Sequence, residues 1–69
     1  MNDHIYKQVE LTGTSKIGTD DAIRNAIAKA SETVEHLDWF QVIETRGYIK
    51  DGNVEYWQVT LKVGFRLND

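Results

Sequence analysis

The side chains in this sequence that could do chemistry are few, and most lie in its second half. Asp38 and Trp39 are adjacent, Arg46 precedes Gly47, and Gln58 follows near the end of the chain. No glycine-rich phosphate loop, HExxH or GxSxG pattern is present. Cysteine is absent, which excludes disulfides, thiolate metal sites and cysteine nucleophiles. The sequence therefore offers no complete catalytic constellation.

Trp39 is the most informative of these residues. If Asp51 and Gly52 form a two-residue hairpin turn, Trp39 lies opposite Gly64 on the facing strand. A large aromatic ring opposite a residue without a side chain leaves room for a planar ligand or for a ring of another subunit. The pattern by itself favours the second interpretation, in which Trp39 packs at a subunit interface.

Gln58 and Arg46 are predicted on the strands of the same hairpin. The Gln58 amide can both donate and accept hydrogen bonds, and a solvated strand position explains it equally well. Arg46 could act as a fixed cation or as a planar stacking group. An ion pair with Glu44 or Glu55 is the simpler role, and we favour it.

His36 and Asp38 could form half of a metal site or of an acid–base pair. A histidine in the last turn of a helix more commonly complements the negative end of the helix dipole. Asp38 would then end the helix or orient the following strand. His4 and His36 are the two histidines of the chain, too few for an obvious zinc cluster, and we predict no metal site.

Length and composition predict one small domain over residues 1–69 that depends on a partner subunit. The chain is 41% hydrophobic and 28% charged, which is typical of a globular protein. A domain of this size buries only about 60% of its unfolded surface, so oligomerisation is the expected source of stability. The net charge of −3 argues against nucleic-acid binding. No membrane-spanning run or signal-peptide pattern is visible, and we expect a cytoplasmic protein without a membrane partner.

The elements that must position these residues are predicted in the order β-α-β-β, an α+β fold. The sequence predicts a strand over 4–11, a loop over 13–18, a helix over about 20–36 with Thr19 as its N-cap, and strands over 39–50 and 54–67. In a regular hairpin one face carries Phe40, Val42, Val59, Leu61 and Val63 toward the helix. The opposite face carries Trp39, Ile43, Ile49, Tyr56, Gln58, Thr60 and Gly64. A β-bulge would shift part of this assignment.

The lengths of these elements do not match. A 14-residue strand spans about 45 Å and a 17-residue helix about 25 Å, so one helix cannot cover the hairpin. The second face of the sheet also carries tryptophan, isoleucine and tyrosine, and exposed apolar patches of this kind mark interfaces. We therefore expect an obligate oligomer.

Motifs spread over nearly the whole chain resemble the dodecins, small flavin-binding proteins that assemble as hollow dodecamers. The resemblance runs through Tyr6-Lys7-x-Val9-Glu10-Leu11-x-Gly13-Thr14-Ser15, Asp21-Ala22-Ile23, Leu37-Asp38-Trp39-Phe40-x-Val42, Glu44-x-Arg46-Gly47 and Gln58-Val59-Thr60-Leu61-x-Val63-Gly64-Phe65-Arg66-Leu67. It implies a three-stranded antiparallel sheet partly wrapped around one helix, twelve copies of which form the shell.

The resemblance also implies a ligand and the residues that hold it. Trp39 matches the tryptophan that stacks on the flavin isoalloxazine, and Gln58 matches the glutamine that hydrogen-bonds its polar edge. Asp38 and Arg46 match positions that line the pocket in bacterial members, which favour FMN, with riboflavin and FAD as alternatives. The implied function is non-catalytic flavin storage with protection against flavin photochemistry.

Some bacterial dodecins also bind coenzyme A, and the basic residues Lys7, Lys29 and Arg66 fall near where such an anion would lie. Two rivals to flavin storage therefore remain from the sequence. One is a coenzyme A-carrying or purely structural shell in which Trp39 serves only packing. The other is an enzyme that uses flavin as a redox cofactor.

Overall fold

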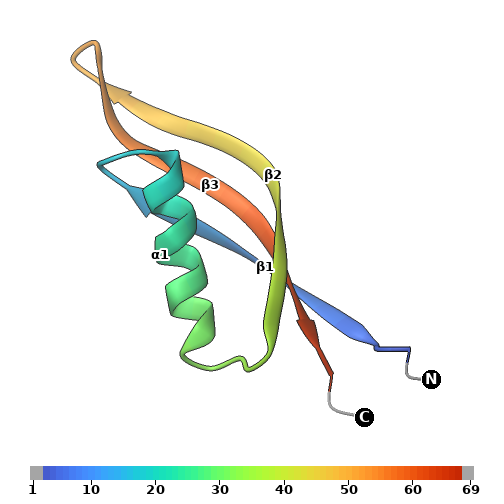
Figure 1. Cartoon of the computed structure of the whole chain (residues 1–69). Helices are drawn as coiled ribbons and strands as arrows, with labels where there is room; N and C mark the ends of the chain where they lie inside the picture. The colour runs from blue at the N-terminus through green and yellow to red at the C-terminus, as the bar shows by residue number, and fades with distance from the viewer. Residues whose placement is uncertain (1–2, 68–69) are drawn as a thin grey trace.

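The computed structural model describes residues 3–67 as one helix lying against one sheet (Figure 1). The order is β1 (Tyr6–Ser15), α1 (Thr19–Ser31), β2 (Leu37–Lys50) and β3 (Asn53–Arg66). The three strands pair antiparallel in the order β1-β3-β2, so β3 is central. This confirms the predicted β-α-β-β fold. Residues 1–2 and 68–69, which include the start of the N-terminal segment judged from sequence, lie outside the described residues.

The hairpin that joins β2 and β3 extends past the helix (Figure 1). Its turn residues Asp51 and Gly52 both have positive φ, at 53° and 76°, and Lys50 pairs with Asn53. Positive φ at both central residues is the signature of a type I′ turn, whose twist matches that of the flanking strands. The predicted turn is confirmed. The predicted register holds over residues 39–42 and 49–50 and is wrong by one residue over 44–48, where bulges interrupt the pairing.

The helix is shorter than predicted. It ends at Ser31, and the next residues close a tight turn in which the amides of Glu32 and Thr33 donate to the carbonyls of Lys29 and Ala30. His36 has a φ of 64° and is not helical. The interpretation of His36 as a dipole partner in the last helical turn is therefore wrong. The apolar periodicity of the sequence extends past the end of the helix because Val34, which lies outside the helix, is also partly buried.

The first strand is longer than predicted, and the helix begins differently. Residues 13–15 pair with 57–59 of β3 and so belong to β1, not to a loop. Thr19 is the first helical residue, while Gly18 is the N-cap and provides no side-chain bond. Ser15 does the anchoring: its hydroxyl accepts from the Ile17 amide at 2.8 Å and donates to Asp21 Oδ2 at 2.7 Å.

The core is small and lies between α1 and the β1–β3 half of the sheet. It contains Ala22, Ala26, Val59, Leu61 and Val63, which confirms the predicted inward face of β3. Phe40 and Val42 pair with Val63 and Leu61 and therefore share that face. They remain 48% and 41% exposed because the helix does not extend over β2.

The isolated protomer is elongated, with extents of 56 × 20 × 13 Å. Its radius of gyration is 14.4 Å, against about 11 Å for a compact chain of this length. The exposed large apolar side chains of β2 are Trp39, Phe40, Val42, Ile43, Tyr48 and Ile49. An exposed apolar surface of this kind is typical of a subunit interface. No helix among residues 3–67 is long and apolar enough to cross a membrane.

We expect Asp51→Pro to destabilise the protein by about 1–3 kcal/mol, because proline cannot adopt the positive φ that this position requires. Asp51→Asn is the matched control, since asparagine is common in the first position of type I′ turns. Thermal unfolding of both variants measures the difference. Equal stability of Asp51→Pro and the parent would show that the turn does not set the strand register.

Candidate functional site

Trp39 lies on the face of the sheet away from the helix, with its indole against Gly64. The two residues pair across β2 and β3, as predicted. A Cβ on Gly64 would overlap Cε2 and Cζ2 of the indole and would lie 2.7 Å from Cδ2. Gly64 is buried while Trp39 remains 39% exposed. The glycine thus lets the indole lie flat on the backbone and leaves part of its surface open for stacking.

Irregularities in the β2–β3 pairing change which residues face each other. The pairing shifts between Val42 and Glu44 and again between Tyr48 and Ile49. Ile43 is the extra residue of β2, and Glu55 is the extra residue of β3. A β-bulge changes which side chains of the two strands lie opposite each other and which face they occupy. A regular hairpin would place Thr45 opposite Gln58, whereas here Arg46 takes that position.

Arg46 and Gln58 form a direct contact as a result. The Arg46 Nε–H donates to Gln58 Oε1 at 2.5 Å. The predicted ion pair with Glu44 is also present, at 3.9 Å between Nη1 and Oε1, but both side chains are more than half exposed. Pairs of this kind contribute about 0–1 kcal/mol. Glu55, the other predicted partner, lies 3.8 Å from Lys50 instead.

Polar and aromatic pairs continue along the same face. The hydroxyls of Thr12 and Thr60 lie 2.9 Å apart, and the rings of Tyr48 and Tyr56 stack with centroids 4.6 Å apart. Partial burial and then the neighbouring Tyr48 raise the pKa of the Tyr56 phenol above its ordinary value. The pairing of the two tyrosines had no clear sequence signal, because it depends on the position of the bulges.

Trp39 and Gln58 are well separated within one protomer. Trp39 pairs with Gly64 of β3, and Gly64 lies six residues from Gln58 along that strand. At about 3.3 Å per residue this is about 20 Å. The structure thus brings Arg46 and Gln58 together but leaves Trp39 at the other end of the face. A ligand that contacted both side chains would lie between two copies of the chain.

Asp38 is unpaired at the start of β2, where the register shifts between Leu37 and Trp39. It lines a small cavity of about 140 Å³ together with Trp39, Phe40 and residues of the core. It also borders a second cavity with His36 and Arg66. No group of three or more metal-binding side chains occurs within residues 3–67, and His36 and Asp38 gain no third partner there.

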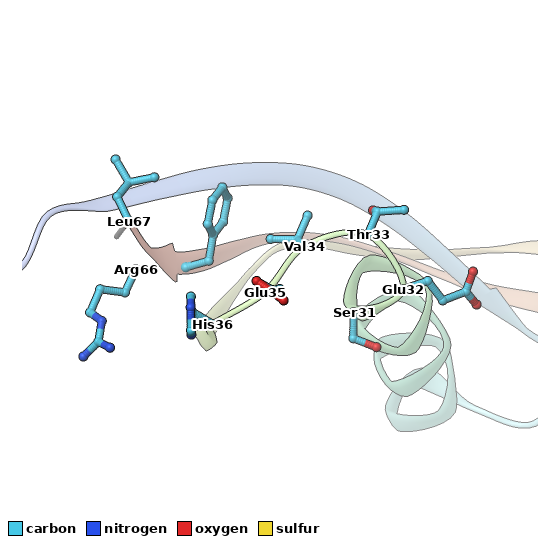
Figure 2. A pocket seen from close by; sticks show the side chains of 9 residues that line it. Ser31, Glu32, Thr33, Val34, Glu35, His36, Arg66 and Leu67 are labelled. Atoms are coloured by element: carbon cyan, nitrogen blue, oxygen red, sulfur yellow. The ribbon is translucent and has the colours of Figure 1, made fainter. Parts of the chain in front are cut away.

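The three basic residues considered for an anion do not gather at one place. Arg66 borders an open cavity of about 590 Å³ between the 31–36 segment and the end of β3. Figure 2 shows Arg66 and His36 at one end of it and Glu32 at the other. Lys29 pairs with Glu32 at 3.4 Å on the exposed helix surface. Lys7 lies on β1 opposite Phe65.

Comparisons with known proteins point to one family. The Dodecin family model matches residues 5–68. A curated dodecin from Thermus thermophilus is 52% identical over 65 residues, 94% of each chain. The dodecin from Streptomyces coelicolor matches with a TM-score of 0.93 at 52% identity, covering 100% of this chain and 99% of that chain. The dodecin from Streptomyces davaonensis has a TM-score of 0.93 at 51% identity, covering 99% and 100%.

We expect Gly64→Ala to displace the Trp39 indole, because the added methyl group would occupy the volume of its six-membered ring. Overpacking of this kind costs about 1–3 kcal/mol. Lys62→Arg is a control on the same strand and face, since it nearly preserves side-chain size and charge. Tryptophan emission and thermal unfolding should change in Gly64→Ala only. An unaltered emission spectrum would contradict the close packing of the ring on residue 64.

Proposed function

The chain belongs to the dodecin family, and on this premise we propose that it is a non-catalytic protein that binds and stores flavin, with FMN as its ligand. The observation that carries the proposal is the Trp39 indole, held flat on Gly64 and partly open. A planar aromatic surface of this kind suits a planar aromatic ligand. Flavin isoalloxazine combines such a ring system with a polar edge that Gln58 can recognise.

The proposed site is shared between protomers. Because Trp39 and Gln58 lie about 20 Å apart on one sheet, the stacking ring and the polar contact come from different copies of the chain. Arg46 accompanies Gln58 and Asp38 accompanies Trp39 in this arrangement. Flavin binding therefore requires assembly, and we propose the homododecamer implied by the family as the assembled form.

The proposed chemistry is protection rather than turnover. A stacked indole is an electron-rich donor beside the electron-accepting flavin ring, and rapid electron transfer between them would quench the excited flavin. This needs no acid or base from the chain. What the chain supplies is orientation by Gly64 and Trp39, hydrogen bonding by Gln58, and exclusion of solvent by the assembled shell.

Coenzyme A is a second candidate ligand, supported by the position of Arg66 beside the 590 Å³ cavity. The support is weaker, since Lys29 is paired with Glu32 and Glu35 also lines the cavity. A redox enzyme would need a substrate cavity beside the flavin and a proton donor. An oxidase or reductase assay of flavin-loaded protein separates that function from storage.

We expect Trp39→Ala to weaken FMN binding by about one to two orders of magnitude, because aromatic stacking contributes about 1–3 kcal/mol per ring. Flavin fluorescence should return in the complex that remains. Trp39→Phe is the matched variant: it keeps a stacking ring but is a poorer electron donor, so binding should survive better than quenching. Titration of FMN with emission as the readout measures both. Tight, quenched binding by Trp39→Ala would refute the site.

We expect the assembled particle to sediment near twelve times 7.9 kDa at micromolar concentration. The exposed apolar surface of β2 is the physical reason. Native mass spectrometry of the purified protein reads the stoichiometry and the ligand together. A folded monomer at this concentration would refute the assembly, and a full assembly carrying coenzyme A but no flavin would favour the second candidate.

A further inference from the structure

We propose that Arg46 is a positioning residue that fixes the Gln58 amide in one of its two orientations and so selects the ligand edge that the site accepts. The ligand-selecting part rests on the proposed flavin site. The contact itself lies within one protomer and does not depend on a ligand.

The chemistry of the contact decides the orientation of the amide. Arginine has only N–H donors, so the group of Gln58 that faces Arg46 must be its oxygen. The observed bond joins Arg46 Nε to Gln58 Oε1 at 2.5 Å, and the charged donor strengthens it. The Nε2 hydrogens of Gln58 then point away from Arg46. A free glutamine would present its oxygen and nitrogen interchangeably.

The bulges that create this contact enclose a short segment. The register shifts by one residue after Val42 and shifts back after Tyr48, so only the pairs between these points are altered. Without the shift Thr45 would face Gln58, and its hydroxyl, which both donates and accepts, would leave the amide free to turn. Arg46 would alternate onto the helix side of the sheet. Bulges are concentrated next to functional sites.

Glu44 lies 3.9 Å from Nη1, and the stacked Tyr48 and Tyr56 form the next pair along the face. The restraint on the amide comes from the Nε–H itself, which donates across the strands to Gln58.

The consequence is a preference among ligand edges. A fixed Gln58 offers N–H donors in one direction, which suits a carbonyl group, and its oxygen keeps one lone pair for an N–H beside that carbonyl. The pyrimidine edge of isoalloxazine has this pattern of carbonyl groups flanking an N–H. A ring that places an amino group there would meet a donor and be rejected.

The first test is a double-mutant cycle with Arg46→Ala, Gln58→Ala and the double variant, titrated with FMN and with riboflavin. In Arg46→Ala the Gln58 side chain is free in the unbound protein and must be immobilised on binding. The affinity for each ligand should therefore fall by about three- to tenfold. In the Gln58→Ala background, removal of Arg46 should change binding less than twofold. Lys50→Ala is the control, since Lys50 is an exposed cation of the same hairpin and pairs with Glu55.

Two outcomes of this cycle would overturn the proposal. Additive losses would mean that Arg46 acts independently of Gln58. A loss confined to FMN, with riboflavin unaffected, would mean that Arg46 binds the phosphate group and not the amide.

The second test needs no ligand. The chain has three arginines, and the Nε–H resonance of Arg46 is assigned by its disappearance in Arg46→Lys. In the parent this proton should exchange slowly with water, and in Gln58→Ala it should exchange at least tenfold faster. Exchange unchanged by Gln58→Ala would refute the contact. If exchange depends on Gln58 but the parent binds no flavin, the contact stands while the proposed function and the ligand-selecting role fail.

Discussion

The constraint on which the rest of this structure depends is a mismatch of lengths. A 13-residue helix spans about 20 Å, whereas each 14-residue strand of the hairpin spans about 45 Å. The helix therefore covers β1 and the adjoining part of β3, where Ala22, Ala26 and Leu61 form the core, and it leaves β2 with apolar side chains exposed. The protomer by itself leaves this surface unburied, and exposed apolar patches of this kind are typical of interfaces.

The same hairpin carries the candidate site, and its geometry is controlled by few residues. The type I′ turn at Asp51 and Gly52 sets the register, and the bulges at Ile43 and Glu55 alter it over a short segment. Outside that segment the regular pairing keeps Trp39 on Gly64. Inside it, Arg46 takes the place opposite Gln58 that a regular hairpin would give to Thr45. A change of one residue in register thus determines which side chain orients the proposed ligand contact.

The separation of Trp39 from Gln58 links function to assembly. One protomer holds a stacking ring at one end of the open sheet face and an amide donor near the other, and a ligand that uses both must lie between two copies. The proposed flavin site then lies on the sheet face opposite α1, and a second copy of the chain completes it. Protein stability and ligand binding would be coupled, since a ligand that contacts two chains favours the assembled state by mass action.

Local signals in the sequence determined the order β-α-β-β, the amphipathic stripe of α1, the positive-φ turn and the pairing of Trp39 with Gly64, because each depends on neighbouring residues or on counting from one turn. The tertiary structure alone decided where the helix ends, that Ser15 rather than Thr19 anchors its start, and that β1 extends to Ser15. It also decided the contact between Arg46 and Gln58. Bulges and strand ends depend on pairing between distant segments and on the area that the helix can cover. These energies are non-local, and no pattern within a single strand encodes them.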